Sequence, residues 1–322
     1  MSPSLNLVFA GTPRFAVPTL EALVDAGYEV SLVLTQPDKP RGRGMELSAS
    51  PVKQSALTRN LAIAQPDRVK NNPEFQAQLT AINPDAIVVV GYGRIIPQWM
   101  IDLPRYGNLN VHASLLPKYR GAAPIQWAIA EGEKVTGVTI MRIDAGLDTG
   151  DILRQRELPI SPDDTAETLA PPLANVGAAL MIETLRQLMQ DKIKAVPQDD
   201  SRASLAPILR KEDGRIDFHR SASQIRNRLR GFQPWPGAFT TFRGKNLHIW
   251  SAQTIPANSV PANLSPGEVT ALDGLLILGC GQKTALELNE LQVEGKKRMS
   301  GRDFANGYRP FPGEILGASP QP

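Results

Sequence analysis

Cysteine is nearly absent from this chain of 322 residues, in which Cys280 stands alone. One thiol can form no internal disulfide and supplies no metal cluster, so we expect no metal site and a reducing, cytoplasmic setting. Long apolar runs are absent too. No stretch of about 18 apolar residues occurs, and residues 1–5 lack the basic segment and apolar run of a secretory signal. The sequence therefore predicts neither a membrane span nor a signal peptide.

The glycines of a dinucleotide site are also missing. Residues 11–16 follow a predicted strand at 5–10, where a nicotinamide-binding turn would carry three glycines. Gly11 is the only glycine in this turn. The pattern argues against NAD and favours a tight turn at Gly11.

Histidine is scarce, and one of the three histidines has a suggestive neighbour. Residues 108–112 read as a short strand that carries Asn110 and His112. Alternation along a strand sends these two side chains to the same face. An amide donor beside a titratable base suits chemistry at a carbonyl, where one group holds the oxyanion and the other manages protons.

A carboxylate partner for His112 is available further along the chain. Residues 136–143 read as a second buried strand that runs into the glycine-rich acidic turn at 144–151. A carboxylate on such a turn can bond an imidazole and fix its tautomer. Asp148 is the choice among three acids, while Asp144 and Asp151 could equally cap or close the turn. Each feature alone is more often structural, and only their combination points to catalysis.

Strands alternate with helices in the first half of the chain. Strands are predicted at 5–10, 28–35 and 85–90, and helices at 17–26 and 125–131. This alternation predicts an α/β fold with a doubly wound, mostly parallel sheet that binds ligands beyond the carboxyl ends of its strands.

One helix in this region is in doubt. Pro171 and Pro172 fall where a helix from 165 to 180 is expected. Because proline lacks an N–H and clashes with the preceding turn, we expect this helix to begin later, near Leu173.

The second half has a different pattern. An amphipathic helix is predicted at 223–230, and glycine, proline and asparagine then separate short segments typical of a small barrel. These predicted strands are 237–242, 247–255, 267–271, 274–278 and 285–291.

Charge is distributed unevenly between the two halves. From Arg210 onward there are 15 basic and 10 acidic residues, against 20 and 22 before it. Such an imbalance suits a module that meets a polyanion. We expect a catalytic domain at 1–190, a linker at 191–209, an RNA-binding domain at 210–316 and a disordered tail at 317–322.

Two central motifs carry a family resemblance. Residues 110–124 (NVHASLLPKYRGAAP) and 137–152 (GVTIMRIDAGLDTGDI) resemble the folate-dependent formyltransferases, in particular those that act on tRNA. The resemblance implies a Rossmann-like formyltransferase domain followed by an OB-like barrel. Shorter motifs extend it over nearly the whole chain, at 9–13, 35–40, 50–53, 91–93, 234–236 and 295–297.

The resemblance also implies a site and a cosubstrate. Asn110, His112 and Asp148 would form a catalytic trio, and 10-formyltetrahydrofolate would be the formyl donor, without a metal. The methionyl amine would attack the formyl carbon directly, with Asn110 and protonated His112 stabilising the oxyanion and Asp148 orienting His112. The residues implied for the folate pocket are Gly91, Tyr92, Gly93, Ser114, Leu115, Leu116, Pro117, Lys118, Tyr119, Arg120 and Gly121.

The implied acceptor is initiator methionyl-tRNA, formylated for translation initiation by a monomer that needs no membrane. Arg41 and Arg43, on a long loop at 36–49, would contact the acceptor end. Lys296, Lys297 and Arg298 would contact the RNA backbone.

Two alternatives stay open. One is an enzyme of the same fold that formylates a sugar amine or hydrolyses the formyl-folate, although a small acceptor needs neither the basic loop nor the basic barrel. The other is an RNA-binding module without activity, against which the intact trio speaks.

Overall fold

The protein is described by a computed structural model that covers residues 5–41, 46–256, 258 and 264–318, without the side chains of Arg41 and Glu46. Contacts between Cα atoms divide the chain into two compact units. The N-terminal unit comprises residues 1–124, 135–159 and 169–207, and the C-terminal unit comprises 125–134, 160–168 and 208–322.

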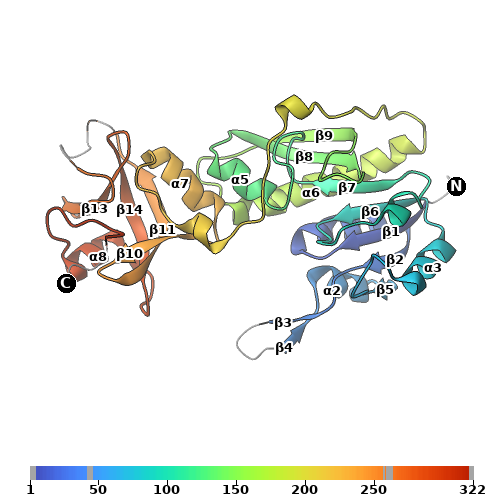
Figure 1. Ribbon diagram of the computed structural model, residues 1–322, viewed down its shortest axis with the longest axis horizontal. Coiled ribbons are helices and arrows are strands. Elements are labelled where there is room, and N and C mark those ends of the chain that lie inside the picture. The colour runs from blue at the N-terminus through green and yellow to red at the C-terminus, as the bar shows by residue number, and fades with distance from the viewer. Residues whose placement is uncertain (1–4, 42–45, 257, 259–263, 319–322) are drawn as a thin grey trace. The chain divides into compact units, whose positions relative to one another are not determined.

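The N-terminal unit is built on a seven-stranded sheet with the order β5-β2-β1-β6-β7-β8-β9 (Figure 1). Pairing is parallel from β5 to β7 and antiparallel from β7 to β9. The predicted mostly parallel α/β sheet is therefore confirmed. Its strands are β1 (Asn6–Gly11), β2 (Glu29–Leu34), β5 (Ile63–Ala64), β6 (Ala86–Val90), β7 (Asn108–His112), β8 (Val135–Arg142) and β9 (Ile152–Pro159).

Helices and a small hairpin complete this part of the chain. The helices are α1 (Val17–Asp25), α2 (Pro51–Thr58), α3 (Pro73–Ile82), α4 (Gln98–Ile101) and α6 (Ala166–Leu188), preceded by the 3-10 turn η1 (Arg14–Ala16). The hairpin consists of β3 (Lys39–Arg41) and β4 (Glu46–Ser48), which pair antiparallel within the predicted basic loop.

Strand burial and strand direction place the segment with Asn110 and His112 at one edge of the sheet. Every residue of β6 is apolar and buried, as expected for a parallel strand covered on both faces. Parallel strands β1, β6 and β7 bring their carboxyl ends to the same edge. Thr12 follows β1 there, Gly91 to Gly93 follow β6 and Ser114 follows β7. This is the edge where an open α/β sheet binds its ligands.

Helix α6 differs from the sequence-based expectation. It begins at Ala166 and runs through Pro171 and Pro172 without interruption, so the predicted late start near Leu173 is wrong. Both prolines are exposed, and so are Glu167 and Thr168, whose carbonyls lose their N–H partners. Water can reach those carbonyls, so the prolines are tolerated on this face of the helix.

The C-terminal unit contains an antiparallel sheet with the order β10-β11-β14-β13-β12, with β15 paired to β14. This confirms the second, antiparallel part of the expected fold. Within the described residues, no ladder joins β10 to β12. The elements are α5 (Pro124–Ala130), η3 (Lys211–Gly214), α7 (Ala222–Gly231), β10 (Ala238–Phe242), β11 (Lys245–Thr254), β12 (Val269–Leu272), β13 (Leu275–Cys280), β14 (Thr284–Val293), β15 (Met299–Ser300) and α8 (Gly301–Tyr308).

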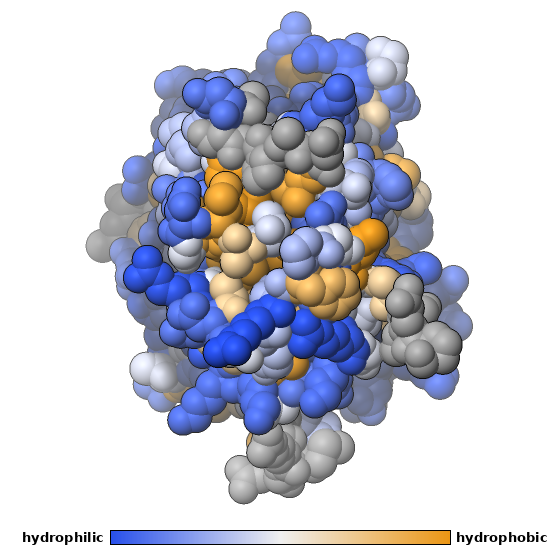
Figure 2. All heavy atoms as spheres, turned by 90° about the vertical axis from the view of Figure 1, so that its left-hand side faces the viewer, coloured by the Kyte–Doolittle hydropathy of each residue, from blue (hydrophilic) through white to orange (hydrophobic). Residues whose placement is uncertain are grey.

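Helix α7 shows the predicted amphipathic pattern. Ser221 and Gln224 form a capping box at its start, which satisfies two free backbone N–H groups. Ile225 and Leu229 enter a core shared with Phe242 and Phe304. On the face of this unit drawn in Figure 2, hydrophobic side chains gather within a hydrophilic surround.

The predicted linker is attached to the N-terminal unit for most of its length. The Arg120 N–H donates to the Ser204 carbonyl at 2.8 Å, and the Ala206 N–H donates to the Arg120 carbonyl at 2.7 Å. Residues 191–207 thus belong to the N-terminal unit. At the other end, the Gly317 N–H donates to the Thr241 carbonyl at 2.7 Å, and residues 319–322 of the predicted tail lie outside the described residues.

Candidate active site

The predicted trio comes together at the edge of the sheet. Asn110 and His112 lie on β7, two residues apart, and Asp148 lies on the loop between β8 and β9. One carboxylate oxygen of Asp148 accepts a hydrogen bond from the Asn110 amide at 3.4 Å. The other oxygen is 3.6 Å from Nδ1 of His112 and accepts the Gly121 N–H at 2.9 Å. The carboxylate thus touches the amide, the imidazole and the loop after β7.

The competing acids are placed differently. The Asp144 carboxylate accepts from the Gly146 N–H at 3.0 Å and from the Thr149 hydroxyl at 2.8 Å, so it closes its own turn. The main-chain carbonyl of Asp151 accepts a hydrogen bond from the Arg142 N–H at 3.0 Å, so Asp151 helps to close the turn through its backbone. Of the three acids, Asp148 is the one that lies against His112.

His112 is buried and is held on both sides of its ring. Its Nε2 is 2.9 Å from the Tyr119 carbonyl oxygen. A carbonyl can only accept, so Nε2 carries a proton in this arrangement. Nδ1 faces the Asp148 carboxylate at a distance of 3.6 Å. Both nitrogens are therefore directed at acceptors.

Side chains on β8 and β9 hold the loop from Ser114 to Gly121 in place by hydrogen bonds to its backbone. The Thr139 hydroxyl on β8 donates to the Ser114 carbonyl at 2.7 Å and accepts the Leu116 N–H at 3.1 Å. Gln155 on β9 donates to the Leu116 carbonyl at 2.8 Å. Ser114 and Leu116 are buried. Among the predicted folate residues of this loop, the side chains open to a ligand are Leu115, Pro117, Lys118 and Tyr119.

Arg120 has a different environment from the one implied by the sequence. Its side chain is 7% exposed, and its guanidinium donates to Gln198 at 3.0 and 2.8 Å and to Asp200 at 2.7 Å. The charge is thus matched inside the protein. Arg120 joins the loop after β7 to the segment at 198–206.

Gly91, Tyr92 and Gly93 follow β6 at the same edge, and both glycines have positive φ values. The Tyr92 side chain points into the core, and burial raises the pKa of its phenol to about 12. Its carbonyl, in contrast, accepts from the Thr12 hydroxyl and the Gln36 amide, both at 3.0 Å. This segment therefore offers main-chain groups, rather than a tyrosine side chain, to the sheet edge.

Gln198 is part of the site that sequence reasoning missed. Its amide nitrogen donates to the Asp148 carbonyl at 2.8 Å and to the Gly150 carbonyl at 2.7 Å, while its oxygen accepts from Arg120. It supports the turn that presents the Asp148 carboxylate. A glutamine in a polar connector carries no signal of this in the sequence.

Replacing Gln198 with leucine is expected to lower the kcat of the site about tenfold and leave KM nearly unchanged, because Gln198 supports a group of the site without lining it. The turn at 148–150 would lose two hydrogen bonds, and Arg120 would lose an acceptor, at a cost of about 2 kcal/mol in unfolding free energy. Steady-state kinetics and thermal unfolding test this. Gln190→Leu, at an exposed position after α6, is the matched control. A native kcat in Gln198→Leu would show that the turn at 148–150 keeps its position without the Gln198 hydrogen bonds.

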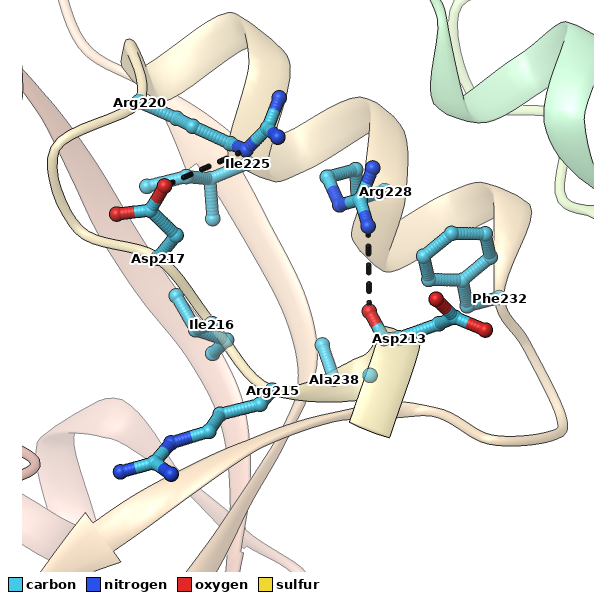
Figure 3. A pocket seen from close by; sticks show the side chains of 10 residues that line it. Asp213, Arg215, Ile216, Asp217, Arg220, Ile225, Arg228, Phe232 and Ala238 are labelled. Carbon is cyan, nitrogen blue, oxygen red and sulfur yellow. Dashed lines mark hydrogen bonds and ion pairs between the residues drawn. The ribbon is translucent and has the colours of Figure 1, made fainter. Parts of the chain in front are cut away.

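Cavities occur in both units of the chain. One, of about 200 Å³, lies at the carboxyl ends of β1 and β2 and is lined by Thr12, Pro13, Gln36, Pro37, Ser50 and Pro51, among others. The other, of about 10 Å³, lies beside α7 and is drawn in Figure 3. There Arg228 donates to the Asp213 carbonyl at 3.3 Å and stacks on Phe232, and Arg220 lies 3.6 Å from Asp217. The second space holds one water molecule at most.

The structure describes the side chains of some of the predicted RNA-binding residues and not of others. Arg41 ends β3, and its side chain is not described, while Arg43 lies outside the described residues. Lys296 and Lys297 are exposed in the C-terminal unit. The Arg298 guanidinium lies 3.6 Å above the centre of the Trp250 ring.

The described residues contain no group of three or more histidine, cysteine or acidic side chains arranged to hold a metal ion. No helix in the part of the chain that the structure describes has the length and apolar character needed to cross a bilayer.

Comparison with known proteins finds matches along most of the chain. Residues 5–185 match the formyl transferase family, and residues 208–309 match the formyl transferase C-terminal domain. The methionyl-tRNA formyltransferase of Koribacter versatilis is 65% identical over 97% of this chain and 98% of its own length. The enzyme of that name from Acidobacterium capsulatum is 59% identical over 98% of this chain and 100% of its own.

Solved structures with lower identity share the fold. WlaRD, a sugar 3N-formyl transferase, has a TM-score of 0.65 at 20% identity, covering 92% of this chain and 100% of its own. HypX from Aquifex aeolicus, in complex with tetrahydrofolic acid, has a TM-score of 0.60 at 17% identity, covering 98% of this chain and 51% of its own.

Proposed function

This chain belongs to the formyl transferase family, and we propose that it transfers the formyl group of 10-formyltetrahydrofolate to the α-amino group of methionine on initiator tRNA. The observation that carries the proposal is the 65% identity to a methionyl-tRNA formyltransferase along almost the full length of both chains. The trio adds support, because amide, imidazole and carboxylate lie in contact at the ligand-binding edge of the sheet.

The proposed reaction is a direct displacement. The methionyl nitrogen bonds to the formyl carbon, the bond from that carbon to N10 of the folate breaks, and the proton lost by the amine ends on N10. The Asn110 amide carries two hydrogens, so one can bond Asp148 while the other meets the oxyanion. The Nε2–H of His112 would leave the Tyr119 carbonyl and donate instead to the oxyanion that forms on the formyl oxygen. Asp148 keeps the imidazole oriented.

The residues present are compatible with a folate. Two large apolar side chains stay exposed on loops next to the trio: Ile95 is 87% exposed and Leu147, beside Asp148, is 63% exposed. Apolar walls with a few fixed polar groups are typical of sites for aromatic ligands. Main-chain groups at Gly91–Gly93 and the side chains of Leu115 and Pro117 would complete the folate site.

The cavity at the ends of β1 and β2 fits the acceptor better than the folate. At about 200 Å³ it is smaller than typical sites for drug-sized ligands, yet it can hold a side chain or a sugar. One strand, β6, separates β1 from β7, which puts the cavity about 10 Å from the trio. An aminoacylated RNA end can reach from one to the other.

The test is formyl transfer from 10-formyltetrahydrofolate to charged initiator tRNA, run beside free methionine, an amino-sugar nucleotide and no acceptor. Transfer to the charged tRNA at a rate at least a thousandfold above the small acceptors is expected. Transfer to the amino sugar, or folate consumption that needs no acceptor, would instead identify a small-acceptor enzyme or a hydrolase. We also propose that the chain acts as a monomer, which gel filtration of the 35.0 kDa chain checks.

A further inference from the structure

An aromatic row lies on the outer face of the C-terminal sheet. It consists of Phe239 on β10 and of His248 and Trp250 on β11, all half-buried, while their strand neighbours face the core. Phe239 and His248 are register partners with ring centres 5.8 Å apart. The rings of His248 and Trp250 are 5.9 Å apart and inclined by 23°. Burial and nearby Lys211 lower the pKa of His248, so this ring is neutral at pH 7.

Arg298 extends the row toward solvent. Its guanidinium lies 3.6 Å from the centre of the Trp250 ring, and Nη1 is 3.7 Å from the Glu290 carboxylate. The side chain is nevertheless 50% exposed. A guanidinium stacked on an indole keeps its second face for another flat group.

The loop that carries Arg298 is attached to the same indole. Trp250 Nε1 donates to the Gln292 side chain at 3.1 Å, and the Gln292 amide donates to the Lys296 carbonyl at 2.9 Å. Lys296 and Lys297 precede Arg298 and are exposed. The row thus ends in a planar cation held in place by its contacts, beside two exposed positive charges.

We propose that Arg298, stacked on Trp250, binds an unpaired base of RNA face to face, with Lys296 and Lys297 beside the phosphates. This rests on the proposed function in that the RNA in the cell would be the tRNA substrate. Stacking on a base differs from a contact with the phosphate backbone of RNA, in which Arg298 would act only as a point charge. Bases stack on guanidinium planes and aromatic rings, and a lysine ammonium offers no such plane.

The decisive variant is Arg298→Lys, which keeps the charge and removes the plane. Binding of the full-length protein to a single-stranded RNA of about eight nucleotides is measured by fluorescence anisotropy over a range of salt concentrations. We expect binding at least tenfold weaker than native, with an unchanged salt slope. Lys297→Ala is the matched control and should weaken binding less, while reducing the slope by about one.

A second probe separates bases from phosphates. An abasic strand of equal length keeps the phosphates, so native protein should bind it as weakly as Arg298→Lys binds the intact strand. Native affinity in Arg298→Lys, equal binding of both strands, or no binding of the intact strand by native protein would each overturn the proposal. These measurements need no folate, so they stand or fall separately from the formyl transfer assay.

Discussion

Replacing His112 with alanine is expected to lower kcat for formyl transfer by about a thousandfold, with little change in the KM for either substrate. His112 is buried between the Asp148 carboxylate and the Tyr119 carbonyl, where it can serve the reacting centre without carrying much ground-state binding. Removal of a positioned acid–base group costs about 10²–10⁴ in rate, and removal of an oxyanion donor costs a similar factor. Single-turnover transfer with saturating folate and charged tRNA measures the chemical step.

His219→Ala provides the control, because that residue is exposed and lies in the C-terminal unit. Its kcat should equal the native value. If His112→Ala retained more than a tenth of the native rate while folded, His112 would be a structural residue and not the acid–base group.

Replacing Gly150 with alanine is expected to lower kcat about 100-fold and the melting temperature by roughly 10 °C. A Cβ at Gly150 would overlap the Arg142 carbonyl oxygen, a main-chain atom that cannot swing away. Relief requires moving the end of β8 or the turn that holds Asp148. Overpacking of this kind costs about 3 kcal/mol, and a displacement of about 1 Å in a catalytic group costs about 100-fold in rate.

Gly146→Ala tests whether this effect is specific to Gly150. Gly146 lies on the same turn, but the atoms nearest to an added Cβ belong to the side chain of Thr149, whose hydroxyl can turn away at the loss of its hydrogen bond to Asp144. Less than a tenfold loss is expected there. Equal losses at both positions would mean that the whole turn is intolerant of side chains, and native behaviour of Gly150→Ala would refute the backbone argument. Differential scanning calorimetry and the same transfer assay supply both readouts.

Local patterns made the sheet and the arrangement of the trio predictable. The apolar run at 86–90 could only be a buried strand, and alternation placed Asn110 and His112 on one face. The choice among three acids had no local basis, because Asp144, Asp148 and Asp151 occupy one short turn. Only the fold brings the Gly121 N–H and the Asn110 amide to Asp148.

Features that depend on distant contacts could not be predicted. The sequence could not reveal that Arg120 pairs with Asp200, 80 positions away, nor that Tyr92 points into the core. Proline at 171 and 172 is unfavourable in most helices and is tolerated in α6 because that face meets water. The Arg298–Trp250 stack joins residues on β11 and the loop before β15, and each of them alone looks like an ordinary surface position.

Residues 191–207 hydrogen-bond to the loop after β7, so the position of a crossover in recombination between related chains should decide whether these contacts are kept. The segment follows α6 and precedes the second unit in sequence, yet Gln198, Ser204 and Ala206 hydrogen-bond to the loops that position Asp148 and Arg120. A recombination event with its crossover near residue 190 would give the active site a foreign set of these partners. A crossover near 208 would keep them together with the loops they support. Inherited modules in this architecture should therefore carry the connector with the catalytic half.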